Sequence, residues 1–201
     1  MLMNKNNVSS PEQMLHKVKH RKFFLNARPW IKTAIVFLLI TTLLSTIAIL
    51  PYVRIYGTAM EPTLLDGDLG LAISAKDYHA GDIIAFRHGD KVLVRRIIAV
   101  PGSTVEIDES GIVTVDGITL EEPYLTQPAL QQCNIQFPYT VPDGEFFVMG
   151  DNRADSVDSR STVLGCVSKD EVIGRVVVIF FPFNRFQWNP SEAHIPNGGS
   201  L

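Results

Sequence analysis

The chain has 201 residues, of which 46% are hydrophobic and 19% charged, enough for one sizeable core plus a membrane segment. Its formal net charge of −3 conceals an asymmetry, because the first 32 residues carry seven Lys or Arg against one acid, whereas the remainder carries 11 against 20. A basic head before an acidic body is typical of membrane topology, and the body has no basic stripe with interleaved aromatic residues, so we expect no nucleic-acid partner.

Residues 1–32 form the basic segment, which we expect on the cytoplasmic side of a membrane. The sequence Ser-Ser-Pro-Glu at residues 9–12 could cap a short basic helix lying on anionic lipid. A tail without regular structure fits the same residues equally well.

Residues 33–53 contain no charged side chain and predict a single transmembrane helix. At about 1.5 Å per residue this run spans roughly 30 Å, the thickness of the hydrocarbon core of a bilayer. Trp30 and Tyr52 stand near its ends, as interfacial aromatic residues do. The run is longer than the core of a cleavable signal peptide and lacks the polar face of a soluble helix. We therefore expect a cell-membrane protein with a cytoplasmic N-terminus and an extracytoplasmic body.

Strand and turn signals dominate from residue 54 onward and predict a mostly β domain over residues 54–183, followed by a polar tail over 184–201. Asp116-Gly117 is a strong hairpin signal, and three prolines make 121–138 an irregular excursion. No helical period is sustained after residue 60. The expected strands are 82–86, 92–100, 104–107, 112–115, 118–120, 145–149 and the nearly all-apolar central strand 172–181.

Cys133 and Cys166 are the only cysteines, and neither has the spacing of a zinc ligand. In an extracytoplasmic domain they could form a disulfide. Two small buried apolar residues would explain them equally well.

The stretch Tyr56–Leu64 follows the apolar run directly, so its chemistry is expected at a membrane surface. Pro62 fixes its own φ and disfavours helical geometry at Glu61, while Gly57 permits a tight backbone. We therefore predict a rigid, irregular loop here rather than the start of a helix.

Two further motifs follow this loop in the sequence. One joins Gly81–Phe86 to Val92–Gly102, with Arg95-Arg96 before a hydrophobic run that ends in Pro-Gly. The other, Gly150–Arg160, reads Gly-Asp-Asn-Arg-Ala-Asp-Ser-Val-Asp-Ser-Arg.

In this order after an apolar anchor, the three motifs resemble those of type I signal peptidases, in their short Gram-positive form. The last motif has all eight fixed positions of the family pattern Gly-Asp-Asn-Arg-x-x-Ser-x-Asp-Ser-Arg. The resemblance runs from the membrane segment to about Pro182 and is loose in the middle. It implies a signal peptidase-like β-domain of several short antiparallel sheets, anchored by one N-terminal helix.

In this family a serine hydroxyl attacks the peptide carbonyl, and a lysine amine kept neutral by burial takes its proton. The resemblance puts Ala59 at the nucleophile position and Arg95 at the general-base position. Alanine has no hydroxyl, and a guanidinium stays protonated at neutral pH. The resemblance implies a serine endopeptidase that removes signal peptides from secreted precursors, but we predict that the chain is inactive as written.

The resemblance assigns further roles residue by residue. It implies that Ser156 orients the base, that the N–H groups of Gly57 and Ala59 form an oxyanion hole, and that Asp158 and Arg160 form a structural ion pair beside the site. The resemblance also places five residues in substrate pockets: Ile55, Met60, Leu64, Leu93 and Val94. For Met60 and Leu64, packing in the core of the domain is an equally good explanation.

The expected partners are signal peptides with small residues at the cleavage site, lying extended beside residues 54–57 and 92–94, and the lipid bilayer. We expect no cofactor and no metal. The neighbouring groups Thr58 and Lys91 are poor replacements for the missing pair, because adjacent side chains on an extended segment point apart and four strand residues span roughly 13 Å.

Two explanations for the missing serine and lysine are open. An enzyme inactivated by deliberate Ser→Ala and Lys→Arg substitution is slightly favoured, because the third motif is intact. The other is a natural non-catalytic homologue that binds signal peptides or assists assembly of surface proteins. A purely structural membrane-anchored β-domain leaves Gly150–Arg160 unexplained, and a self-cleaving repressor-type fold would not need residues 33–53.

Overall fold

The computed structural model describes residues 30–42, 44–45, 50–125, 127–128 and 133–191. The chain divides after Leu50 into two compact units. In the first unit residues 30–42 and 44–45 are helical, and residues 43 and 46–49 of the predicted membrane segment lie outside the described residues. A search of the described part of the chain finds no helix that is both long enough and apolar enough to span a bilayer.

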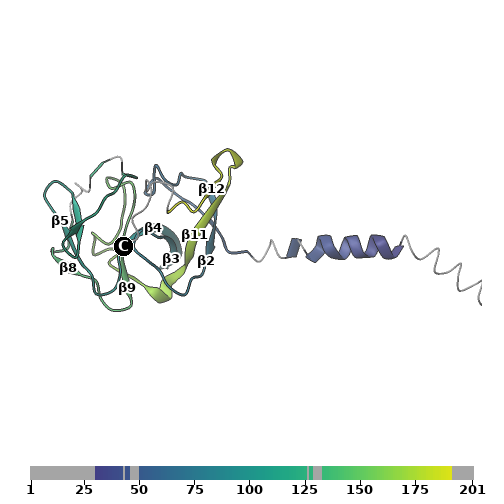
Figure 1. Ribbon diagram of the computed structural model, residues 1–201, viewed down its shortest axis with the longest axis horizontal. Coiled ribbons are helices and arrows are strands. Elements are labelled where there is room, and N and C mark those ends of the chain that lie inside the picture. The colour runs from purple at the N-terminus through teal and green to yellow at the C-terminus, as the bar shows by residue number, and fades with distance from the viewer. Residues whose placement is uncertain (1–29, 43, 46–49, 126, 129–132, 192–201) are drawn as a thin grey trace, which may run out of the picture. The chain divides into compact units, whose positions relative to one another are not determined.

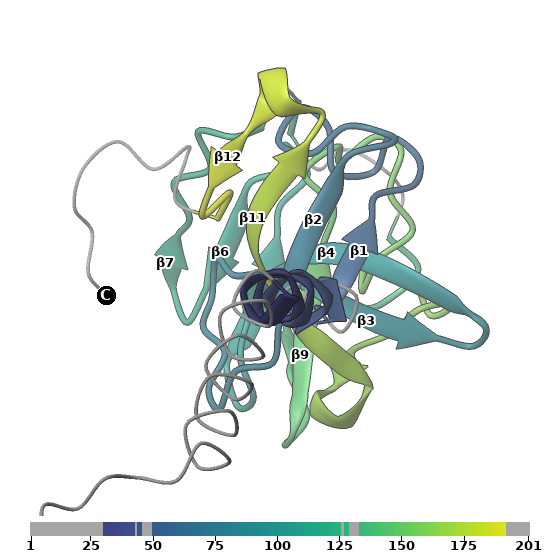
Figure 2. The same cartoon turned by 90° about the vertical axis from the view of Figure 1, so that its right-hand side faces the viewer.

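The second unit is built on an eight-stranded antiparallel sheet. Seven strands lie side by side in the order β1-β2-β11-β3-β4-β9-β10. The eighth strand, β12, pairs with the C-terminal half of β11 (Figures 1 and 2). The bounds are β1 Tyr52–Arg54, β2 Leu69–Ile73, β3 Ile83–His88, β4 Lys91–Ala99, β9 Glu145–Met149, β10 Val167–Ser168, β11 Val172–Phe181 and β12 Gln187–Trp188.

A second, four-stranded sheet has the order β7-β6-β5-β8. It consists of β5 Thr104–Ile107, β6 Val113–Val115, β7 Ile118–Thr119 and β8 Tyr139–Thr140, and Figure 1 shows β5 and β8 on the side of the domain opposite β2 and β11. Two short 3₁₀ helices, η1 Lys169–Glu171 and η2 Phe183–Arg185, flank β11.

Three hydrophobic clusters form the core of the domain. One lies under β1, β2 and β11 and contains Ile55, Met60 and Leu64; a second joins β9 to the four-stranded sheet through Phe147 and Val105. The third contains Phe86 and Val148 of the large sheet. The loop that follows β1 is therefore pinned to the core by its own apolar side chains.

The seven predicted strands are all present, within two residues at each end. Asp116 and Gly117 both have positive φ, 52° and 79°, as a two-residue hairpin between β6 and β7 requires. The nearly all-apolar β11 is central, since it pairs with β2 on one edge and β3 on the other. Periodicity and turn chemistry are local signals, which is why these elements could be predicted.

The boundaries at both ends of the domain differ from the prediction. Tyr52 and Val53, which we assigned to the membrane helix, lie in β1, because Pro51 precedes them and cannot continue a helix. The polar tail expected from residue 184 belongs to the domain as far as residue 191. There β12 pairs with β11, and Ser191 Oγ accepts a hydrogen bond from the Ile83 N–H at 3.0 Å.

Candidate active site

The loop Gly57–Leu64 consists of bends and turns, as predicted. The Glu61 N–H donates to the Thr58 carbonyl at 3.0 Å, and the Leu64 N–H donates to the Met60 carbonyl at 2.9 Å. Met60 and Leu64 are buried, whereas Ala59 is half-buried. The two buried side chains that follow Ala59 thus anchor the loop in the core.

Arg95 lies in the middle of β4 and is only 7% exposed. Its Nε and Nη2 donate to the Val157 carbonyl at 3.1 and 3.0 Å, and its Nη1 donates to the Val94 carbonyl at 2.6 Å. Burial lowers the pKa of the guanidinium; the Asp158 carboxylate opposes that change and Arg160 adds to it. A guanidinium is nevertheless a cation at neutral pH and cannot accept a proton there.

Ser156 lies beside the backbone of Ala59. Gly150 packs between them so closely that a Cβ on this residue would meet Ser156 Oγ at 2.3 Å and the Ala59 carbonyl oxygen at 2.4 Å. The Asn152 N–H donates to that same carbonyl at 3.0 Å. The third motif therefore holds the Ala59 backbone directly, and only glycine fits at position 150.

The Ser156 hydroxyl is buried, and no atom of the described residues forms a hydrogen bond with it. A buried hydroxyl without a partner costs about 1–3 kcal/mol. The Arg95 guanidinium donates to two backbone carbonyls, and none of its hydrogen bonds goes to Ser156.

A groove of about 610 Å³ runs over the Ala59 and Arg95 side chains. One wall is residues 51–56, which include β1, and the other is residues 90–95, which include the first five residues of β4. Among the described strands, β1 pairs only with β2, and β9 pairs with β4 only from Arg96 onward. Each wall of the groove therefore has a strand edge without a partner strand.

Four of the five residues predicted to form substrate pockets line this groove: Ile55, Met60, Leu93 and Val94. Leu64 does not line it. Its side chain is fully buried in the cluster under β1 and β2, so for Leu64 core packing is the correct interpretation.

The predicted oxyanion hole is only partly available. The Gly57 N–H donates to Asp66 Oδ1 at 2.8 Å, so in this structure it is not free to bind an oxyanion. This competition could not be predicted from the motifs, because Asp66 lies outside all three of them. None of the described residues accepts a hydrogen bond from the Ala59 N–H.

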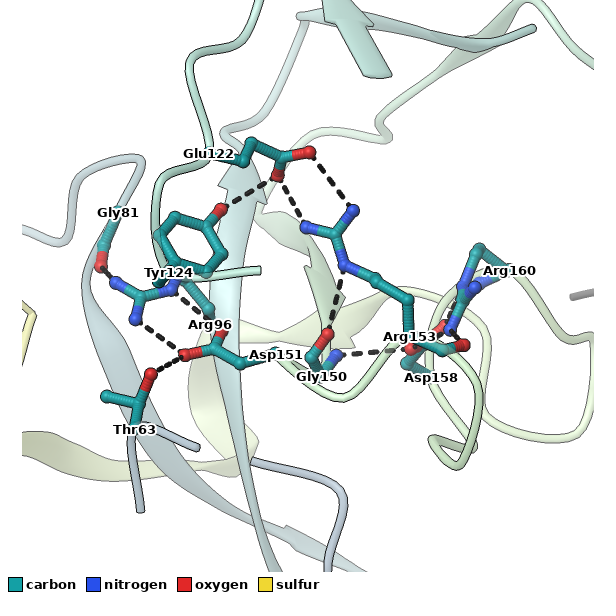
Figure 3. Close-up of polar contacts among 10 residues, drawn as sticks. All are labelled: Thr63, Gly81, Arg96, Glu122, Tyr124, Gly150, Asp151, Arg153, Asp158 and Arg160. Carbon is teal, nitrogen blue, oxygen red and sulfur yellow. Dashed lines mark hydrogen bonds and ion pairs between the residues drawn. The ribbon is translucent and has the colours of Figure 1, made fainter. Parts of the chain in front are cut away.

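The predicted ion pair between Asp158 and Arg160 is present and buried. Arg160 Nε and Nη2 bind the two carboxylate oxygens at 2.8 Å each, and Asp158 Oδ2 also accepts the Gly150 N–H at 3.1 Å. The pair therefore fixes the backbone at Gly150 (Figure 3). Ser156 and Ala59 pack against this glycine.

A larger polar network, which the motifs alone did not reveal, continues from this ion pair (Figure 3). Arg153 donates to the Gly150 carbonyl at 3.0 Å and to both oxygens of Glu122, and Tyr124 donates to Glu122 at 2.8 Å. The Arg96 guanidinium lies 4.0 Å from the centre of the Tyr124 ring. The excursion after residue 120 therefore covers the arginines that support the site.

Arg96 ties the network to the loop at Ala59. It binds both oxygens of Asp151 at 2.9 and 2.7 Å, and Asp151 accepts the Thr63 hydroxyl at 2.5 Å. Burial alone would lower the pKa of Arg96, but the hydrogen bond and charge of Asp151, with the charge of Glu122, raise it. The loop, β4 and the third motif are thus linked by charge-assisted hydrogen bonds.

The two neighbouring groups considered above as replacements for the missing nucleophile and base are bound to another residue or exposed. The Thr58 hydroxyl donates to Asp155, and Lys91 is exposed at the start of β4. Both cysteines are thiols: burial raises the pKa of Cys133, and burial raises that of Cys166 to about 11. Among the described residues, no three His, Cys, Asp or Glu side chains gather as a metal site needs.

Comparison with known proteins gives consistent results. The sequence model of the family described as "Signal peptidase, peptidase S26" matches residues 27–181. The chain is 33% identical to signal peptidase I of Bacillus licheniformis over 171 residues, 79% of this chain and 90% of that protein. It is 32% identical to signal peptidase I S of Bacillus subtilis over 170 residues, 79% of this chain and 91% of that protein. A crystal structure of a signal peptidase I from Enterococcus faecalis, 32% identical, covers 51% of this chain and 99% of its own, with a TM-score of 0.41.

Proposed function

Because the chain belongs to the signal peptidase family S26, we propose that it holds an extended segment of a secretory signal peptide in the groove beside Ala59 without cleaving it. The observation that carries the proposal is that Ala59 and Arg95, the two substituted positions, line one groove between two unpaired strand edges.

The groove suits an extended peptide on physical grounds. A strand entering it would find the free edges of β1 and β4 for main-chain hydrogen bonds, which give affinity in β-strand addition. Its floor is apolar, with the nearly buried side chains of Ile55, Met60 and Val94. Such a floor favours small apolar side chains at alternate positions of the peptide.

Cleavage is absent because both reacting groups are replaced. In a serine protease, losing the nucleophile alone lowers turnover by about 10⁶-fold. Here Ala59 offers a methyl group and Arg95 a fixed positive charge, and the resemblance puts these two residues at the dyad positions. Beside them the ion pair between Asp158 and Arg160 is formed, and Gly150 packs against Ser156 and the Ala59 backbone.

We further propose that residues 33–50, the part of the apolar run that precedes β1, anchor the chain in the cell membrane, with the basic N-terminus in the cytoplasm and the β-domain outside. The apolar run and its basic flank support this orientation. In sealed cells, external protease should degrade the β-domain and spare an N-terminal tag. Degradation of the tag would contradict the orientation.

A binding titration tests the main proposal. A fluorescent precursor peptide with an Ala-x-Ala site is titrated with the full chain in detergent, and we expect saturable binding with no product. The variant Leu93→Arg, which puts a charge into the groove wall, should weaken binding. Its control, Ile118→Arg, changes an exposed residue of β7 that does not line the groove. Non-saturable binding, or equal loss in both variants, would contradict the proposal.

A further inference from the structure

Four arginines of the domain are almost fully buried: Arg95, Arg96, Arg153 and Arg160. Three of them pair with a carboxylate: Arg96 with Asp151, Arg153 with Glu122, and Arg160 with Asp158. Among the described residues, no carboxylate lies within ion-pair distance of Arg95. A buried charge of this kind is normally paired, because leaving it without a counter-charge is costly.

Arg95 also keeps hydrogen-bonding capacity. A guanidinium has five N–H groups, and the three hydrogen bonds to Val157 and Val94 leave one on each Nη atom. Arg95 lines the groove. Ala59 lines the same groove, and its N–H donates to none of the described residues. The Ser156 hydroxyl, which packs near the Ala59 backbone, also has no hydrogen-bond partner in the described residues.

The free edge of β4 ends beside Arg95, and this favours the binding of a peptide terminus at that point. Residues 91–94 of β4 have a free edge, but from Arg96 onward β9 occupies it. A peptide that pairs along β4 must therefore end or leave the sheet beside Arg95. A positive charge at that point repels an α-amino group and attracts an α-carboxylate.

We propose that the Arg95 end of the groove is a receptor for a peptide C-terminal carboxylate, so that the chain binds a cleaved signal peptide in preference to the uncut precursor. This inference rests on the proposed function, since it names the form of peptide that the same groove holds. The positive charge of Arg95 balances the negative charge of the peptide carboxylate. Because Ala59 is smaller than serine by one oxygen atom, a carboxylate oxygen can occupy the space where a serine hydroxyl would lie. The remaining charged residues at the groove are Arg54, Lys91 and Asp90, so the groove as a whole is net positive.

The test uses the full chain in detergent and three fluorescent peptides with the same signal sequence. One ends at the Ala-x-Ala site as a free acid, the second is its C-terminal amide, and the third continues past the site. Since hydrogen bonds to charged groups are strong, we expect the acid to bind about tenfold to a hundredfold more tightly than the other two. Equal affinities would overturn the inference and leave the proposed function standing, whereas absence of binding by all three would overturn both.

Variants assign the effect to the site. Arg95→Gln should abolish the preference for the acid, and Arg87→Gln, which removes an exposed cation of β3 outside the groove, should keep it. Ser156→Ala, which deletes a hydroxyl without a partner and should fold normally, should reduce the preference severalfold. A full preference in both Arg95→Gln and Ser156→Ala would overturn the assignment. An amide peptide ending in Asp that binds as tightly as the free acid would also overturn it, because the ligand would then be a side chain.

Discussion

The substitution Asp151→Asn removes the counter-charge of Arg96 with almost no change in shape. Arg96 is 1% exposed, and both of its bonds to Asp151 are short, at 2.9 and 2.7 Å. Removing one partner of such a pair typically costs about 3–5 kcal/mol, because the other charge stays buried. With a urea m-value of about 2 kcal/mol/M, the unfolding midpoint should fall by about 1.5–2.5 M.

The assay is urea unfolding of the full chain in detergent, followed by tryptophan fluorescence. The control variant is Arg175→Gln, which breaks the partly exposed pair with Asp82 and should cost no more than about 1 kcal/mol. In an Arg96→Gln background, Asp151→Asn should cost much less, since the buried charge is already gone. If Asp151→Asn shifted the midpoint no more than Arg175→Gln, the description of the network as a structural support would be wrong.

Three further predictions follow from the packing and the titration of individual groups. Gly150→Ala should destabilise the domain by about 1–3 kcal/mol through overpacking against Ser156 and Ala59, measured as a lower urea midpoint, and an unchanged midpoint would contradict the close packing. Leu64→Ala should cost about 2–5 kcal/mol of stability because the side chain is fully buried, whereas Leu93→Ala should mainly weaken peptide binding; the reverse pattern would show that the groove is misassigned. In a Cys133→Ser background, alkylation of Cys166 by iodoacetamide should still accelerate from pH 9 to about 11, because burial favours the protonated thiol. A rate with its midpoint near pH 8.5 and a plateau by about pH 10, as in a free cysteine peptide, would contradict the raised pKa.

The strands that could be predicted are those with strong local signals. The hairpin at Asp116-Gly117 and the apolar strand β11 are each predicted from a few consecutive residues. By contrast, β2 was missed, because its five residues include Gly70 and no regular alternation. Its place in the sheet comes from pairing with β1 and β11. β11 is distant in sequence, and most of β1 was assigned to the membrane helix.

The candidate site shows the same division. Ala59, Arg95 and Ser156 were selected from motifs, and the structure brings them together around the groove and Gly150. Glu122 and Tyr124 could not be selected, because their role depends on a fold-back of an irregular segment onto Arg153 and Arg96. A glutamate and a tyrosine near prolines carry no pattern that distinguishes them from surface residues.

Leu64 and Gly57 show where a motif is insufficient. Both lie in the family loop, yet one side chain faces the core and one N–H is occupied by Asp66. Position in a motif fixes which residues are near the site, whereas orientation depends on packing and on competing hydrogen bonds.

The most direct test of the account is the double substitution Ala59→Ser with Arg95→Lys. The full chain in detergent is incubated with a secretory precursor that has an Ala-x-Ala site, and the products are identified by mass. We predict cleavage at that site at least about 10³-fold faster than with the unmodified chain, and no comparable gain from either substitution alone. A double variant that binds the precursor and leaves it uncut would contradict the claim that the residues at positions 59 and 95 are what prevents cleavage.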